Sequence, residues 1–95
     1  MSVDLLDEIF KDVFRDQQLI KIRLERRRRR KEVTILEGFD DKNIDIYDLA
    51  TKLKSKLACG GTTKNGRIEL QGDHRYRARE ILIELGFNPD SILVE

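Results

Sequence analysis

Cysteine and histidine are almost absent from this sequence of 95 residues, which has one of each, Cys59 and His74, and no tryptophan. A single cysteine excludes a disulfide within the chain and any zinc site built from several cysteines. No apolar stretch approaches the roughly 20 residues that a membrane-spanning helix needs, and the first residues lack the basic and apolar regions of a signal peptide. The sequence therefore predicts a cytoplasmic protein without a membrane partner.

A net charge of one sign is also lacking, since 19 basic residues stand against 18 acidic ones, for a balance of +1. The charges are nevertheless unevenly distributed. Residues 1–20 hold five acids and two bases, whereas residues 21–32 hold two acids and eight bases. Positive charge is therefore concentrated in one short segment, LERRRRRKEV at residues 24–33, and that concentration calls for a polyanionic partner or a solvated loop.

The hydrophobic pattern divides the chain into two parts. Apolar residues at helical spacing predict an acidic amphipathic helix within residues 1–18. Apolar and polar residues then alternate at residues 20–24 and 33–35, which predicts two strands flanking the arginine run. We therefore expect a main domain at residues 19–95 that presents the arginines at the end of a hairpin.

Capping and turn signals place the remaining elements. Asp45 is the expected N-cap of a helix that Gly60–Gly61 end, and Asp73 is the expected N-cap of a helix that Gly86 closes. Asn65–Gly66 predicts a tight turn between two strands, because this dipeptide accepts the positive φ angles of such a turn. The final SILVE segment predicts a last short strand.

The resulting order after the leading helix is β-β-α-β-β-α-β. Each helix has one apolar stripe and most strands have one apolar face. A two-layer α+β sandwich satisfies all of these faces, with a mostly antiparallel five-stranded sheet and two helices on one side.

Catalytic and metal-binding chemistry find little support in the residues. Cys59 and His74 are the only candidates for a thiol–imidazole pair, but Cys59 follows apolar residues at a helix end, where a small buried side chain is the ordinary explanation. The acidic stretch DDKNID lacks the glycine and glutamate positions of a calcium loop. The sequence therefore predicts neither an enzyme nor a metal or cofactor site.

Arginine dominates the basic segment, and its planar guanidinium pairs with phosphate in a bidentate manner better than lysine does. Six aromatic residues, in positions that do not line a strand, are too few for a base-stacking sheet. We therefore expect recognition of phosphates and shape, with no contribution of the arginine side chains to the core. The alternative is a charged loop that is only solvated.

Four segments, EVTILEGFD, LKSKLACGG, IELQGDHR and ILIELGFNPDSILV, closely resemble the archaeal and eukaryotic translation initiation factor 1 family in order and spacing. The resemblance covers about residues 20–95. It implies the sandwich fold and a non-enzymatic factor that binds the small ribosomal subunit near the P site. There it would position mRNA and initiator tRNA, promote start-codon fidelity and meet other initiation factors.

The resemblance also implies which residues contact RNA. The family's basic hairpin loop matches a run of six cations, its basic helix surface matches three lysines, and its fidelity turn matches the GDHR segment. The corresponding residues are Arg26, Arg27, Arg28, Arg29, Arg30 and Lys31; Lys52, Lys54 and Lys56; and Gly72, Asp73, His74 and Arg75.

Two features depart from the family. Its loops usually contain a glycine near the tip, where this chain has Arg29–Arg30, and many archaeal members carry an N-terminal zinc knuckle, where this chain has the acidic helix. No metal site is therefore carried over. An RNA- or ribosome-binding module of another translation or recycling factor is the alternative function.

Overall fold

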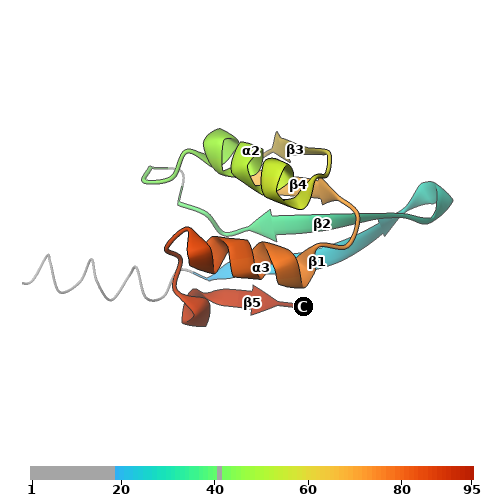
Figure 1. Cartoon of the computed structure of the whole chain (residues 1–95). Helices are drawn as coiled ribbons and strands as arrows, with labels where there is room; N and C mark the ends of the chain where they lie inside the picture. The colour runs from blue at the N-terminus through green and yellow to red at the C-terminus, as the bar shows by residue number, and fades with distance from the viewer. Residues whose placement is uncertain (1–18, 41) are drawn as a thin grey trace, which may run out of the picture.

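The structure, a computed structural model, describes residues 19–40 and 42–95 (Figure 1). The elements follow the predicted β-β-α-β-β-α-β order, with two short 3-10 turns added. They are β1 (Ile20–Arg27), a turn (Arg28–Arg30), β2 (Lys31–Glu37), α2 (Ile46–Leu57), β3 (Gly61–Lys64), β4 (Arg67–Gln71), α3 (Arg75–Glu84), a turn (Pro89–Ser91) and β5 (Ile92–Val94). The helix predicted within residues 1–18 lies outside the described residues.

The five strands form one mixed sheet in the order β3-β4-β2-β1-β5. The pairs β1–β2, β2–β4 and β3–β4 are antiparallel, whereas β5 runs parallel to β1. The parallel pair was not foreseen and corrects the predicted, mostly antiparallel sheet. It arises because α3 carries the chain back along the sheet before β5 begins, which is the kind of long connection that a parallel neighbour requires.

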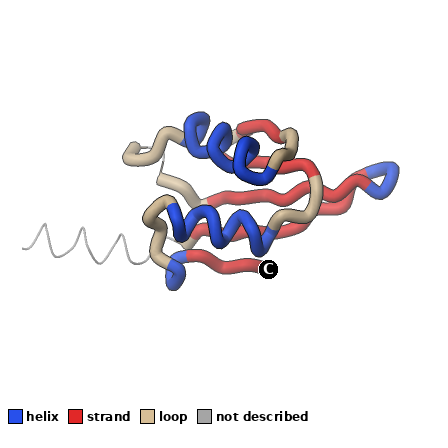
Figure 2. The backbone as a smooth tube through the Cα atoms, viewed as in Figure 1, coloured by secondary structure: helices blue, strands red, loops and turns tan. Residues whose placement is uncertain are grey.

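Both helices cover the same face of the sheet, α2 over β3 and β4 and α3 over β1 and β5 (Figure 2). The core lies between these layers and is built almost entirely from aliphatic side chains. Its members are Ile20, Ile22, Leu36, Ile46, Leu49, Ala50, Leu53, Ile68, Leu70, Ala78, Ile81, Leu82 and Ile92. Neither helix is long and apolar enough to cross a membrane, as far as the described part of the chain extends.

The helix ends confirm some of the predicted caps and correct others. Asp45 caps α2 as predicted, because its carboxylate accepts hydrogen bonds from the backbone N–H groups of the first turn. The helix ends earlier than predicted, at Ala58, which adopts the left-handed conformation with φ of 51°. His74, and not Asp73, occupies the N-cap position of α3, although the Asp73 carboxylate accepts a hydrogen bond of 3.4 Å from the backbone N–H of Arg75.

Thr34 is the buried polar residue that connects the sheet to the start of α3. Its side chain is fully buried on the helix-covered face of β2. Its hydroxyl accepts a hydrogen bond of 2.8 Å from the backbone N–H of His74 and donates one of 2.7 Å to the carbonyl of Gly72. One side chain thereby holds both ends of the turn at residues 72–74 against β2.

We expect Thr34→Val to lower the free energy of unfolding by about 1–3 kcal/mol, because it leaves a donor and an acceptor without partners while preserving the side-chain shape. Urea unfolding measures the loss. Thr34→Ser keeps the hydroxyl and is the matched control, with a smaller loss expected. Equal losses in the two variants would show that the methyl group, and not the hydrogen bonds, matters at this position.

Candidate nucleic-acid interface

The β1–β2 hairpin extends beyond the rest of the sheet. β5 accompanies β1 only along Ile20–Ile22, and the pairing of β2 with β4 begins at Val33. The pairs Arg26–Glu32 and Arg27–Lys31 therefore have strand neighbours only in each other. Figure 1 shows this two-stranded stem projecting from one end of the molecule. The predicted presentation of the arginines on a hairpin is confirmed.

The turn at the end of this hairpin has an unusual conformation for its residues. The N–H of Lys31 donates to the carbonyl of Arg28, and the two residues between them, Arg29 and Arg30, have φ angles of 64° and 60°. Two central residues with positive φ are typical of a type I′ turn, which favours Asn-Gly. The β3–β4 hairpin has that dipeptide, Asn65–Gly66, with φ angles of 52° and 75°. The two hairpins thus have turns with similar φ angles, one formed by Asn65–Gly66 and the other by Arg29–Arg30.

We call residues Arg26–Lys31 the basic tip. Arg28, Arg29, Arg30 and Lys31 make no ion pair with any residue that the structure describes. Arg26 is 84% exposed and lies 3.9 Å from a carboxylate oxygen of Glu32, a distance at which a surface pair contributes little. The tip therefore offers at least four cations to a partner.

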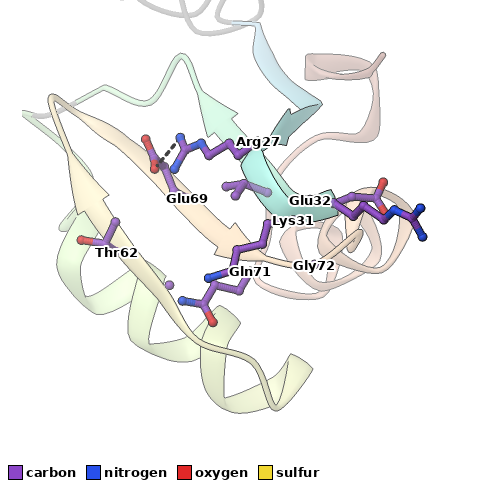
Figure 3. A pocket seen from close by; sticks show the side chains of 10 residues that line it. Arg27, Lys31, Glu32, Thr62, Glu69, Gln71 and Gly72 are labelled. Atoms are coloured by element: carbon purple, nitrogen blue, oxygen red, sulfur yellow. Dashed lines mark hydrogen bonds and ion pairs between the residues drawn. The ribbon is translucent and has the colours of Figure 1, made fainter.

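Arg27 behaves differently from its neighbours and corrects the expectation that the arginine run has no structural role. As the last residue of β1, it points to the face of the sheet opposite the helices, which we call the open face. Its guanidinium lies 3.0 Å from Glu69, as Figure 3 shows. It also lies 3.0 Å from Glu25. The Glu69 side chain is only 7% exposed, so Arg27 compensates a nearly buried carboxylate.

This contact belongs to a network of ion pairs across the open face. Arg23 joins Glu25 to Glu37, and Arg67 lies 3.3 Å from the second oxygen of Glu69. The hydrogen bond from Arg27 holds the pKa of Glu25 below its ordinary value. Val33 and Ile35, on the same face as the network, are buried although neither α2 nor α3 covers them.

The three lysines of α2 do not form one surface. At 100° per residue, Lys52 and Lys56 lie on one side of the helix and Lys54 on the other. Lys52 pairs with Asp48 at 3.1 Å, and Lys56 lies 4.0 Å from Glu84 of α3. Lys54 flanks the core on the side of β3 and remains without an ion pair among the described residues.

The GDHR turn is held by its own side chains and by Thr34. Gly72 has a φ of 100°, which a residue with a Cβ adopts only with strain. The Arg75 guanidinium contacts both carboxylate oxygens of Asp73 at 3.0 Å and donates to the carbonyl of Glu95 at 2.9 Å. The hydrogen bond from Arg75 keeps the pKa of Asp73 below its ordinary value. The Nε2 atom of His74 lies 2.8 Å from the carbonyl of Gln71.

The predicted site residues therefore gather at one end of the molecule but on different faces. The C-terminal end of α2, the N-terminal end of α3 and the turn between β4 and α3 all lie toward the projecting hairpin (Figure 1). Lys52, near the middle of α2, is set back from this end. The chain is therefore a small α+β protein whose projecting hairpin carries exposed arginine side chains.

Comparison with known proteins places this class more narrowly. The model of the family described as translation initiation factor SUI1 matches residues 16–88. Similar proteins include the "Protein translation factor SUI1 homolog" of Thermococcus kodakarensis, 57% identical over 98% of this chain and 96% of the relative, and that of Pyrococcus horikoshii, 57% identical over 98% and 95%. The homolog of Hyperthermus butylicus is 55% identical over 92% of this chain and 84% of the relative. The chain belongs to the translation initiation factor SUI1 family.

Sequence reasoning missed two residues on which the site depends, Thr34 and Glu69. A threonine between apolar residues of a strand looked like ordinary β-sheet composition, although a buried hydroxyl requires partners. Glu69 lies between two apolar residues in IEL, and this alternation predicts a carboxylate that faces solvent. The available signal was the matching alternation of Arg23, Glu25 and Arg27 in β1, which predicts a charged face of the sheet.

We expect Arg27→Gln to lower the melting temperature more than Arg28→Gln does, because Arg27, unlike Arg28, pairs with the nearly buried Glu69. Thermal unfolding by circular dichroism compares the two single variants, each of which removes one charge from the basic tip. An equal melting temperature for both variants would show that the ion pair with Glu69 contributes nothing beyond general charge repulsion.

The pair Asp73–Arg75 predicts a pH-dependent term in stability. The pKa of Asp73 lies below its ordinary 3.8 in the folded state, so its stabilising contribution is present above that value and is lost as pH falls through the lowered pKa. Asp73→Asn should therefore destabilise the protein at pH 6 and have little effect at pH 2. Urea unfolding of both proteins across this range measures the difference. In an Arg75→Gln background the substitution should show a much weaker pH dependence, and an unchanged one would exclude Arg75 as the cause.

Proposed function

We propose that this member of the initiation factor family binds the small ribosomal subunit near the P site, where it promotes mRNA and initiator-tRNA positioning and start-codon fidelity. The basic tip, the half-buried Lys54 of α2 and the GDHR turn are the proposed contacts with RNA. Ribosomal RNA supplies the dense phosphates that an isolated cluster of guanidinium groups requires.

The observation that best supports this proposal is the type I′ geometry of Arg29 and Arg30. Each residue with a Cβ in the left-handed region costs on the order of 1 kcal/mol relative to glycine. The β3–β4 hairpin shows that the same chain uses Asn-Gly where only the turn matters. The backbone strain at Arg29 and Arg30 would be relieved by Asn-Gly, and neither arginine forms an ion pair with a described residue. Both facts support a role for these arginines in binding a partner.

The other proposed contacts differ in how firmly the fold holds them. Arg75 is fixed by Asp73 and the carbonyl of Glu95, so it would contribute a positioned charge. Lys54 has no such restraint and would contribute a mobile one. Thr34 of β2 is hydrogen-bonded to both Gly72 and His74 of the GDHR turn. RNA that binds this turn and displaces it would therefore also displace the hairpin that carries the basic tip.

A binding role without catalysis is part of the proposal. Burial raises the pKa of the Cys59 thiol, which disfavours the thiolate that nucleophilic chemistry needs. The His74 ring is hydrogen-bonded to a backbone carbonyl of its own turn. The same basic tip would serve the alternative, a ribosome-binding module of another translation or recycling factor. Preference for initiation complexes over other states of the subunit distinguishes the two.

The double variant Arg29→Asn/Arg30→Gly tests the proposal by giving the basic tip the dipeptide of the second hairpin. We expect the free energy of unfolding to rise by about 1–2 kcal/mol as the strain is relieved. Affinity for purified small subunits should fall, and the slope of log K against log salt should become shallower by up to about two units, one for each lost phosphate contact. Urea unfolding and titrations at several salt concentrations measure both effects.

The matched control is Lys21→Asn/Lys64→Asn, which removes two exposed charges at the end of the sheet away from the basic tip. It should leave the salt slope nearly unchanged. If the two double variants weakened binding equally, net charge alone would drive association. If the tip variant bound as tightly as the unaltered protein, with the same slope, the proposed contact would be wrong.

A further inference from the structure

A pocket of about 640 Å³ opens on the open face, at the base of the projecting hairpin. We call it the root pocket. Strands β1, β2, β3 and β4 and the turn of the basic tip contribute to it, and Figure 3 shows its side chains from close by. Its charged and polar lining includes Arg27, Arg30, Lys31, Thr62, Glu69 and Gln71. This volume exceeds what a lone phosphate would fill and falls within the range of small-ligand sites.

The electrostatics of the root pocket favour an anion. Arg30 and Lys31 lie on its rim and have no ion pair among the described residues. Glu69 is the acid inside it, but Arg27 at 3.0 Å and Arg67 at 3.3 Å compensate its charge. Glu32 also lines the pocket, yet its side chain is directed away from the other labelled residues (Figure 3).

Other residues of the pocket have polar groups that can form hydrogen bonds with the edge of a planar ligand. The Gln71 amide, which offers a donor and an acceptor side by side, and the Thr62 hydroxyl are exposed and have no hydrogen-bond partner in the described part of the chain. A Cβ at Gly60 would come within 2.9 Å of the Gln71 Oε1 atom, so the glycine leaves room for this side chain. Val33 provides an apolar surface behind them, and Gly61 adds bare backbone.

From this combination we propose that the root pocket binds one unpaired RNA nucleotide. Its phosphate would lie at Arg30 and Lys31, its base would lie against Val33, and the edge of the base would face Gln71 and Thr62. Unstacked bases are the parts of RNA that proteins read through hydrogen bonds, and an amide side chain is suited to a base edge. The proposal deepens the proposed function and rests on it, because it assumes that RNA approaches the basic tip.

The location of the pocket gives the proposal a structural consequence. Lys52 and Lys56 are on the side of the sheet that the helices cover, whereas the root pocket is on the open face, where Gly72 is the residue of the GDHR turn that lines it. A nucleotide bound there would contact the stem of the hairpin from the opposite side. The basic tip would then be held between two RNA segments instead of resting on one.

The test compares the binding of the full chain to two fluorescently labelled RNA hairpins by anisotropy. The hairpins are identical except for a single unpaired adenosine in the stem of one. We expect the protein to bind the bulged hairpin about 5- to 10-fold more tightly, which corresponds to one or two hydrogen bonds. The salt slope should be steeper for the bulged hairpin by no more than about one unit, because this hairpin has one extra phosphate, which the proposal places at Arg30 and Lys31.

Two variants separate the pocket from the tip. Gln71→Ala should abolish the preference while leaving the melting temperature and the affinity for the plain hairpin unchanged, since the exposed Gln71 side chain has no hydrogen-bond partner among the described residues. Thr62→Ala should reduce the preference in the same way. Arg28→Gln, outside the pocket, should weaken both RNAs equally and make both salt slopes shallower by about one unit.

Equal affinity of the unaltered protein for the two hairpins would overturn the proposal, as would a preference that survives Gln71→Ala. In either case a chain that still bound small subunits with a steep salt dependence would retain its proposed function, and only the nucleotide pocket would be wrong. Failure of the unaltered chain to bind small subunits would instead contradict the proposed function itself.

Discussion

The antiparallel pairing of β1 with β2 is the constraint on which the rest of the molecule depends. Its register runs from Lys21–Glu37 to Arg27–Lys31 and continues after the neighbouring strands have ended. Because side chains alternate along a strand, this register decides that Arg27 faces the open side and Arg26 the other. A shift by one residue would expose the apolar residues of β2 and separate Arg27 from Glu69, so the core and the charged tip are specified by the same pairing.

The two faces of the sheet differ in chemistry, since one is aliphatic and the other carries ion pairs. The helix-covered face buries aliphatic side chains and a single hydroxyl, that of Thr34. Neither helix of the described part of the chain covers the open face, yet Val33 and Ile35 are buried there, and the neighbouring charged residues of this face are joined in ion pairs. Such ion pairs keep the open face polar and also hold the stem of the hairpin, which gives the basic tip a defined direction.

Much of this could be predicted from the sequence, for physical reasons. The periodicities of the core and the preference of Asn65–Gly66 for positive φ are local signals, and each predicted the right element. The parallel β1–β5 pair and the ion pair of Arg27 with Glu69 could not be predicted, because they join residues far apart in the chain. The residue pairs involved are separated by 72 and 42 positions, and local patterns do not encode such contacts.

The expected helix ends failed for a related reason. The sequence predicts that Gly60–Gly61 end α2, but the left-handed position falls on Ala58, and Gly61 belongs to β3. A Cβ at Gly61 would meet the carbonyl of Glu69 in the adjacent strand, a close approach that only the folded sheet reveals. The two glycines therefore lie close to the end of the helix, but Gly61 is needed for the pairing of β3 with β4 and not for ending α2.

Binding to purified ribosomal subunits tests the central claim most directly, namely that the exposed guanidinium groups of the basic tip recognise the small subunit. The unaltered chain is sedimented with small or with large subunits at increasing salt concentration. The account predicts that it travels with the small subunit and dissociates steeply as salt rises, while little accompanies the large subunit. Equal binding to both subunits, or none to the small one at low salt, would contradict it.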